Sequence, residues 1–363
     1  MSIELTSLEQ VRAYIDKRTS FNIAADSIEL VKGGYCNYTW RVRLDTPHLC
    51  HQSIILKHAQ PFAAYANSEM IRYEYEALKA ISESPLCGGG LIGVPAVIQY
   101  DEDCHVLIME DIGTVPTLLD YFCTKPAPPC DLVALVATEL ATFIAGVHSW
   151  GKDNVTARRN LPPLQKVVGS PMLKVVIPRA ALSGVIDPLL EQVIGEFTAE
   201  AETSDDTLIM GDYWLGNILI DVEEGPDGFK TLKKLWVIDW EMCRYGNPAK
   251  DVVEIAGDCF FVSRFQDAAV GECMRHHFLK TYDRVSKVNV DPFRVVVGMG
   301  VHWINWARPL GWCANEEEIR ECVDRGLEYV RRGTDKSVDW NSNWARELGH
   351  RVPNVESRIR SHL

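Results

Sequence analysis

Residues 210–221, MGDYWLGNILID, place an aspartate and an asparagine five positions apart, directly before an apolar run. The apolar run is typical of a buried strand. A plain strand does not need a carboxylate at its entrance, and a solvent loop would be more polar than this aromatic segment. Asp212 and Asn217 are therefore candidates for chemistry at the mouth of a buried strand.

The spacing D-x-x-x-x-N is the one that supplies a catalytic base and a magnesium ligand in protein kinases. In such a site the carboxylate of Asp212 would accept a hydroxyl proton, and the amide oxygen of Asn217 would hold a metal on the phosphates. The same spacing also arises by chance from a loop aspartate and a turn asparagine. It therefore needs support from elsewhere in the chain.

Support comes from residues 235–241, LWVIDWE, which end an apolar strand with two carboxylates at period two. Asp239 and Glu241 could be an exposed strand terminus. Their apolar and aromatic neighbours favour partial burial, however, and a buried carboxylate without a partner is costly. Together with Asn217 they form a set of oxygen ligands of the kind that Mg²⁺ prefers.

Phosphate recognition is expected upstream, where Gly33 and Gly34, followed by Asn37, lie between two runs that read as strands. A glycine turn can bring backbone N–H groups close to an anion, although an ordinary hairpin would have the same sequence. Lys57 ends another apolar strand and is able to project into a cleft; the alternative is an edge lysine whose head reaches solvent.

A carboxylate is needed to hold Lys57, and the predicted helix over 68–82 offers one. Glu74 falls within the apolar stripe of this helix, so we predict a Lys57–Glu74 ion pair, with Glu69 as the alternative. Residues 107–113, LIMEDIG, are predicted to form a connector whose edge, at Met109, Glu110 and Ile112, contacts the adenine ring; the alternative is a simple linker between the lobes.

The whole chain has 363 residues, 47% of them hydrophobic, which is enough for two lobes. Its net charge of -13 argues against a nucleic acid or an anionic membrane as the main partner. The 11 cysteines are scattered and include no CxxC pair, which indicates reduced thiols. Without a signal peptide or an uninterrupted run of about 18 apolar residues, we expect a cytoplasmic protein.

Strand and helix patterns predict an α+β fold with two lobes. Residues 1–112 read as a nucleotide-binding lobe with a small antiparallel sheet and one main helix. Residues 113–363 read as a larger, mostly helical lobe for catalysis and substrate binding. It should begin with a long helix over 132–149 capped by Asp131, and Asp251 has the spacing of a helix cap.

Taken together, the motifs resemble the aminoglycoside phosphotransferase and methylthioribose kinase branch of the protein-kinase-like fold. The likeness extends over roughly residues 30–260 and keeps the family's order. Its stretches are GGYCNYTWRV (33–42), SIILKHAQP (53–61), YEYEALKAI (73–81), LIMEDI (107–112), MGDYWLGNILI (210–220) and VIDWEMCRYGNPAKDV (237–252).

This resemblance implies a bilobal small-molecule kinase that uses ATP and Mg²⁺. It implies that Asp212 is the catalytic base, that Asn217 and Asp239 are metal ligands assisted by Glu241, and that Lys57 contacts the ATP phosphates. Within the branch, the chain is most similar to fungal methylthioribose-kinase-like enzymes, including those that phosphorylate 4-hydroxytryptamine. A thioribose or related sugar is the alternative acceptor. The alternative to an enzyme is a nucleotide-binding pseudokinase that regulates a partner.

Two departures from the family pattern affect these expectations. Met210 stands where the family usually has a histidine, which removes a hydrogen bond that braces the loop. The second departure is a tryptophan-rich segment over 301–312, whose arginine suits a hydroxyl-rich or anionic substrate better than a cationic amine. A tryptophan-rich core helix would have the same sequence. We predict that the substrate contacts include Trp214, Trp306, Arg308 and Trp312.

Overall fold

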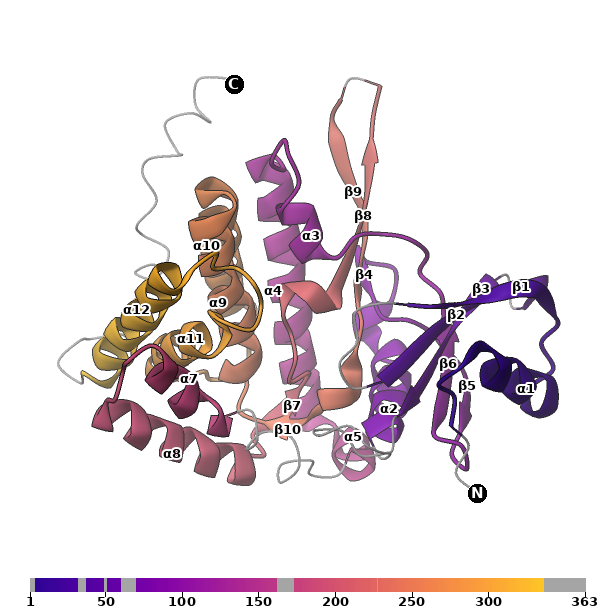
Figure 1. Ribbon diagram of the computed structural model, residues 1–363, viewed down its shortest axis with the longest axis horizontal. Helices are drawn as coiled ribbons and strands as arrows, with labels where there is room; N and C mark the ends of the chain where they lie inside the picture. The colour runs from indigo at the N-terminus through magenta and orange to yellow at the C-terminus, as the bar shows by residue number, and fades with distance from the viewer. Residues whose placement is uncertain are drawn as a thin grey trace.

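A five-stranded antiparallel sheet forms the centre of the amino-terminal lobe in the computed structural model (Figure 1). The structure describes residues 4–31, 37–48, 51–59, 70–161, 173–226 and 228–335. The strand order is β1-β2-β3-β6-β5. The strands are β1 (Ile23–Leu30), β2 (Asn37–His48), β3 (His51–Ala59), β5 (Val97–Asp101) and β6 (Val106–Glu110).

Two helices accompany this sheet, α1 (Leu8–Arg18) and α2 (Met70–Ser82). Ser7 caps α1 in a reciprocal capping box with Gln10, which satisfies backbone donors that the first helical turn leaves open. The apolar stripe of α2 is buried as the sequence predicts, and Glu74 is buried with it. Helix α2 also contacts the short 3₁₀ helix η3 (Trp240–Met242) of the other lobe.

The remainder of the chain is mostly helical, so the predicted α+β architecture with a small sheet lobe and a helical lobe is confirmed (Figure 1). Helix α9 packs against α10 and α11, and α11 packs against α12. The helices are α3 (Leu118–Phe122), α4 (Cys130–Asp153), α5 (Val155–Asn160), α7 (Val176–Leu182), α8 (Pro188–Thr203), α9 (Ala249–Phe265), α10 (Ala268–Val285), α11 (Pro292–Trp306) and α12 (Glu316–Thr334).

Helix α4 differs from the sequence-based expectation in two ways. It begins after Pro129, so Asp131 lies in its first turn and is not the cap; its carboxylate instead accepts the N–H of Leu132 at 2.9 Å. By length and composition alone α4 is apolar enough to cross a membrane. More than half of that apolar stretch is buried, however, and the helix packs against α10 and β7 (Thr207–Ile209), as a core helix does.

Two smaller sheets support the segment between α8 and α9. The two strands expected after Asn217 and before Asp239 form a hairpin of β8 (Ile218–Glu224) and β9 (Lys230–Val237), which extends away from the helices in Figure 1. Strand β4 (Ile92–Gly93) comes from between α2 and β5 in the sequence but pairs in parallel with β9. The third sheet pairs β7 with β10 (Arg244–Gly246).

Because β4 pairs with β9, the predicted lobes 1–112 and 113–363 share a three-stranded sheet. The chain also passes from β6 to α3 through residues 111–117. The nine cysteines within the described residues are all free, as the scattered sequence pattern indicates. Cys36 and Cys50 lie outside the described residues.

Candidate active site

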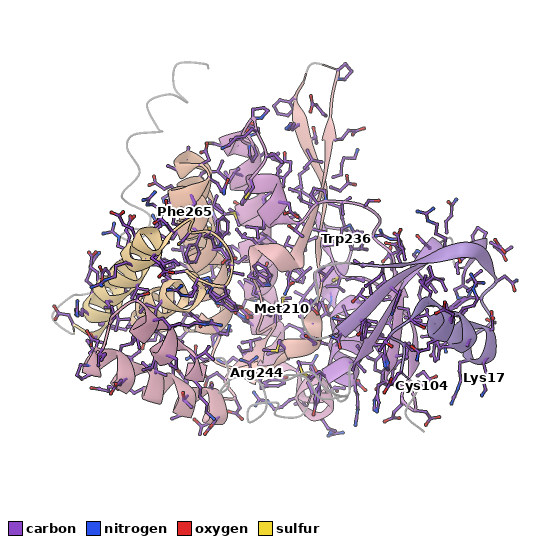
Figure 2. The ribbon with its side chains drawn as sticks, viewed as in Figure 1. Lys17, Cys104, Met210, Trp236, Arg244 and Phe265 are labelled. Carbon is purple, nitrogen blue, oxygen red and sulfur yellow. The ribbon has the colours of Figure 1, made fainter. Side chains whose placement is uncertain are left out.

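The loop between β7 and β8, residues 210–217, occupies the centre of the molecule, where Met210 and Arg244 lie close to the junction of the two lobes (Figure 2). We call it the catalytic loop because it carries the candidate catalytic residue Asp212. Gly211 has φ +82°, a left-handed conformation that favours glycine. A Cβ atom there would come within 2.2 Å of Arg244 Nη1 and 2.5 Å of the Met242 carbonyl oxygen. Both the conformation and the close packing therefore require glycine directly before Asp212.

Asp212 and Asn217 are brought together by a hydrogen bond. The Asn217 amide nitrogen donates to Asp212 Oδ2 at 2.7 Å and to the Asp212 carbonyl oxygen at 3.0 Å. Burial, followed by the negative charges of Glu254 and Asp239, raises the pKa of Asp212 well above its usual value. The carboxylate is therefore a stronger base than an ordinary surface aspartate.

Hairpin pairing places Asp239 beside this loop. Ile218 is opposite Val237, and the Ile238 N–H donates to the Asn217 carbonyl oxygen at 3.0 Å. Asn217 and Asp239 therefore lie at the same end of the hairpin. Asp239 has φ +66°, a left-handed conformation that is unfavourable for a residue with a side chain and is often found at functional sites.

Lys57 lies among the carboxylates of both lobes. Its ammonium group is 2.7 Å from Glu74 Oε2, pairs with Asp239 Oδ1 and is 3.7 Å from Glu241 Oε2. The pairing of Lys57 with Glu74 predicted from the helical stripe is thus confirmed; Glu69 lies outside the described residues. Although burial acts to lower it, these carboxylates hold the pKa of Lys57 well above its usual value, so the side chain stays charged.

The three carboxylates around Lys57 form one acidic cluster. Oxygen atoms of Glu74, Asp239 and Glu241 lie within 4.8 Å of one another. Burial raises the pKa of Glu74 to about 7, against the opposing effect of Lys57. The Asn37 amide nitrogen donates to Glu241 Oε2, while its own oxygen is buried with no hydrogen-bond partner. Asn37 is thus part of the cluster.

The structure does not test the remaining predicted nucleotide contacts. Gly33 and Gly34 lie outside the described residues. Met109 pairs within the sheet opposite Ile55, and the Glu110 N–H donates to the Ala96 carbonyl oxygen at 2.8 Å. Ile112 follows the end of β6. The adenine contacts of Met109, Glu110 and Ile112 stay a prediction.

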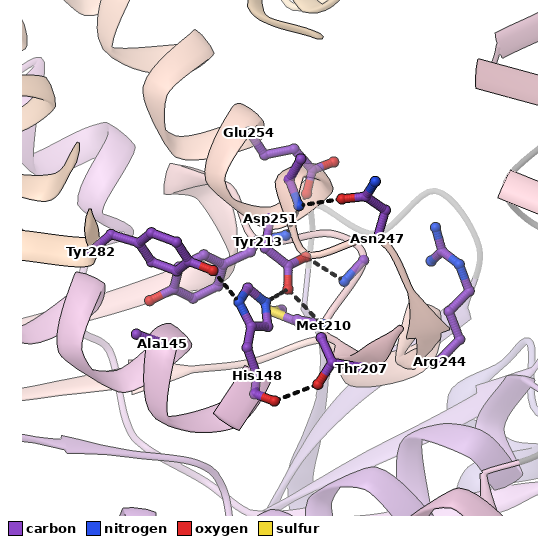
Figure 3. Close-up of polar contacts among 12 residues, drawn as sticks. Ala145, His148, Thr207, Met210, Tyr213, Arg244, Asn247, Asp251, Glu254 and Tyr282 are labelled. Carbon is purple, nitrogen blue, oxygen red and sulfur yellow. Dashed lines mark hydrogen bonds and ion pairs between the residues drawn. The ribbon is translucent and has the colours of Figure 1, made fainter. Parts of the chain in front are cut away.

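Asp251 is a functional candidate that the sequence reasoning interpreted only as a helix cap. It is completely buried inside α9, whose cap is Pro248. Its two carboxylate oxygens accept the backbone N–H groups of Met210 and Gly211, both at 2.8 Å (Figure 3). His148 lies on its other side, with Nε2 3.0 Å from Asp251 Oδ2 and Nδ1 2.7 Å from the Tyr282 hydroxyl.

Two further carboxylates on α9 continue this pattern along the loop. The N–H of Tyr213 donates to Glu254 Oε2 at 2.7 Å, and the N–H of Leu215 donates to Asp258 Oδ2 at 3.1 Å. We call Asp251, Glu254 and Asp258 the α9 carboxylate ladder. It fixes the backbone on both sides of Asp212.

Each carboxylate of the α9 carboxylate ladder also has a basic side chain beside it. Besides the His148 contact of Asp251, Lys250 pairs with Glu254 Oε1, and His302 Nε2 lies 2.9 Å from Asp258 Oδ1. Buried carboxylates without such partners would be costly. The signal in the sequence was three acidic residues at spacings of three and four within the otherwise apolar segment 251–258.

A cavity of about 150 Å³ lies beside the catalytic loop, between α8, α11 and the start of α9. Ile209, directly before the loop, and Arg244, which packs against Gly211, both line it. Its apolar walls include Phe197, Val253, Val301 and Trp306. Because it lies next to the loop that carries Asp212, this cavity is a candidate acceptor site.

Of the four predicted substrate contacts, the structure brings only Trp306 to this cavity. Arg308 forms a two-point ion pair with Glu316, at 2.5 and 2.6 Å, on the surface. Trp312 stacks on Phe261 with ring centroids 5.7 Å apart. Trp214 packs closely over Gly216. The charge of Arg308 is thus balanced within the protein, so it gives no reason to prefer an anionic or sugar acceptor.

Comparison with known proteins supports the kinase interpretation of this geometry. Residues 27–287 match the family described as "Phosphotransferase enzyme family". A 4-hydroxytryptamine kinase of Psilocybe cyanescens is 37% identical over 347 residues, which cover 92% of this chain and 95% of that protein. The 4-hydroxytryptamine kinase of Psilocybe cubensis is 36% identical over 359 residues, 94% of this chain and 95% of the relative.

Among solved structures, an ADP-bound aminoglycoside phosphotransferase is similar at 15% identity, with a TM-score of 0.47; the match covers 89% of this chain and 98% of that one. The family match includes both the catalytic loop and the acidic cluster. The chain therefore belongs to the phosphotransferase enzyme family, and the prediction that it transfers a phosphoryl group to an alcohol is confirmed.

Proposed function

We propose that this chain transfers the γ-phosphoryl group of ATP to the hydroxyl group of 4-hydroxytryptamine. One observation carries the proposal: Asp212, hydrogen-bonded to Asn217, lies at the same end of the β8–β9 hairpin as Asp239, which pairs with Lys57. This arrangement suits phosphoryl transfer, which depends on positioning and charge stabilisation. The acceptor is taken from the two relatives that are 37% and 36% identical.

In this proposal Asp212 orients the acceptor hydroxyl and takes up its proton as the new P–O bond forms. The raised pKa of Asp212 favours that role, because a more basic carboxylate accepts a proton more readily. Lys57, on β3 of the amino-terminal lobe, binds the nucleotide phosphates. Glu74 holds the ammonium group in place from the buried face of α2.

The residues at the hairpin end also fit a magnesium ion. Because the Asn217 amide nitrogen is occupied by Asp212, the amide oxygen remains as a ligand atom. Asp239 is the most exposed member of the acidic cluster, with a side chain 34% exposed, and Glu241 lies near it. Mg²⁺ held by Asn217, Asp239 and Glu241 would supply charge neutralisation on the phosphate oxygens.

The proposal is tested by acceptor turnover in the purified chain with ATP and Mg²⁺. We expect 4-hydroxytryptamine to release ADP and to give a phosphate monoester in ³¹P NMR, with methylthioribose as the comparison acceptor. Asp212→Asn should lower turnover by about 10²-fold or more while nucleotide affinity is retained. The matched control is Asp221→Asn, at an exposed position of β8.

Two results would overturn the proposal. The first is near-normal turnover by the Asp212→Asn enzyme, which would remove Asp212 from the chemistry. The second is nucleotide binding with no phosphorylation of 4-hydroxytryptamine by the unaltered chain, which would leave another acceptor or a regulatory role.

A further inference from the structure

The cavity beside the catalytic loop holds two carboxylates among the described residues that line it, Glu200 and Glu254. They come from different elements: Glu200 is on α8 and Glu254 is on α9. An acceptor with an ammonium group needs one carboxylate as its partner, because a buried cation without a counter-charge is costly. The question is which of the two is placed to serve.

The chemistry of the acceptor limits the choice, and this step rests on the proposed function. In 4-hydroxytryptamine the hydroxyl group on C4 and the aminoethyl chain on C3 lie on the same edge of the indole, attached to the two carbons that flank one ring-fusion carbon. When the hydroxyl faces Asp212, the ammonium group must therefore lie close to Asp212 as well. Its carboxylate partner must belong to the part of the cavity next to the catalytic loop.

Glu254 meets this requirement. Its Oε2 accepts the backbone N–H of Tyr213, the residue directly after Asp212, at 2.7 Å. Its charge also acts on Asp212, since it contributes, after burial, to raising the pKa of that carboxyl group. The side chain is 7% exposed, so any contact with a ligand is made inside the protein.

Glu200 does not meet it. The Asn247 amide nitrogen donates to Glu200 Oε1 at 2.5 Å, and Arg294 Nε lies 3.4 Å from Glu200 Oε2. Both oxygens thus have partners, on α11 and just before α9, and neither of these contacts involves the loop that carries Asp212. Glu200 is also not among the main charges that shift the pKa of Asp212.

Lys250 provides the counter-charge of Glu254 when no acceptor is bound. The Lys250 ammonium group pairs with the second oxygen of Glu254 from one turn earlier in α9. Its side chain is 37% exposed, so it can turn into solvent on a flexible stem. A ligand ammonium group can then take the same place, and the carboxylate keeps a counter-charge in both states.

We propose that Glu254 binds the ammonium group of the acceptor in exchange for Lys250, and that it thereby selects amine-bearing hydroxyindoles. Each carboxylate oxygen of Glu254 then has a separate role. One holds the backbone beside Asp212, and the other fixes the acceptor so that its hydroxyl faces the same residue.

The test compares two acceptors, 4-hydroxytryptamine and 4-hydroxyindole, which has the hydroxyl but no amine. In the unaltered enzyme, kcat/KM should favour the amine. In Glu254→Gln, the amide oxygen can still accept the Tyr213 N–H, but the negative charge is gone. We expect the ratio of the two kcat/KM values to fall about tenfold or more, mainly through the KM of the amine.

The matched control is Glu200→Gln, which removes the other carboxylate of the cavity and should keep the ratio. Glu254→Asp, which retains the charge, should recover part of the selectivity and serves as the second variant if Glu254→Gln does not fold. Thermal unfolding identifies folded variants.

The possible results separate the two proposals. Equal losses for both acceptors in Glu254→Gln would show a purely structural role and overturn the inference. So would a collapse of the ratio in Glu200→Gln instead. Failure of the unaltered enzyme on both acceptors would overturn the proposed function, whereas activity with no preference for the amine would overturn only this inference.

Discussion

Replacing Asp251 with asparagine tests whether the α9 carboxylate ladder holds the catalytic loop. The carboxylate accepts two loop N–H groups at 2.8 Å and faces His148 at 3.0 Å. Asparagine keeps one acceptor oxygen. The least costly arrangement directs that oxygen to Gly211 and the new NH₂ group to His148, which can change tautomer. The N–H of Met210 then has no acceptor.

The cost follows from these contacts. A buried donor without a partner costs about 1–3 kcal/mol, and a neutral acceptor in place of a carboxylate loses about 1 kcal/mol more. We therefore expect Asp251→Asn to lower the free energy of unfolding by about 2–4 kcal/mol, a large share of the roughly 5–15 kcal/mol typical of folded domains. Displacement of Asp212 by even about 1 Å should also lower kcat by about 10²-fold.

Urea unfolding measures the first effect and steady-state turnover measures the second. Glu321→Gln is the matched control, because it makes the same chemical change in an exposed ion pair with Arg264 and should cost less than about 1 kcal/mol. If Asp251→Asn were as mild as this control in both stability and turnover, the loop would not depend on the ladder.

Two further predictions concern the metal and the pH dependence of stability. Asp239→Asn should raise the Mg²⁺ concentration required for half-maximal turnover by about tenfold or more, because a charged ligand is lost; an unchanged magnesium titration would contradict its role as a ligand. Burial lowers the pKa of His58 from 6.5, so below that pH the unfolded chain takes up a proton that the folded chain resists. Stability should therefore fall as the pH drops from about 7.5 to 5.5, and His58→Leu should remove the part of this fall that comes from His58, at most about 1.4 kcal/mol. Urea unfolding at the two pH values measures the fall, and an equal fall in both proteins would refute the prediction.

The parts of the site that sequence could predict are those in which local pattern determines position. Asp212 and Asn217 precede one strand and Asp239 ends the next, so a hairpin brings them together whatever surrounds it. Glu74 could be chosen over its neighbours because helical periodicity turned it towards the core. In both cases the information lies within a few residues of the group concerned.

The parts that sequence could not predict depend on contacts between distant elements. His148 and Asp251 are 103 positions apart, and their contact depends on how α4 and α9 pack. Arg308 looked available for a substrate because nothing in its own segment showed that Glu316, in the next helix, would pair with it. Trp306 and Trp312 are close in sequence, yet only the former lines the cavity, since α11 ends between them.

The pairing of β4 with β9 has a consequence for how the enzyme would open and close. Ile92 and Gly93 are held by the hairpin that ends at Asp239, while the strand that follows, β5, belongs to the sheet of Lys57. A hinge between the sheet of Lys57 and the loop of Asp212 would then bend three connections: residues 83–91 between α2 and β4, residues 94–96, and residues 111–117. Rotation about these connections would draw Lys57 away from Asp239 and leave Asp212 and Asn217 undisturbed.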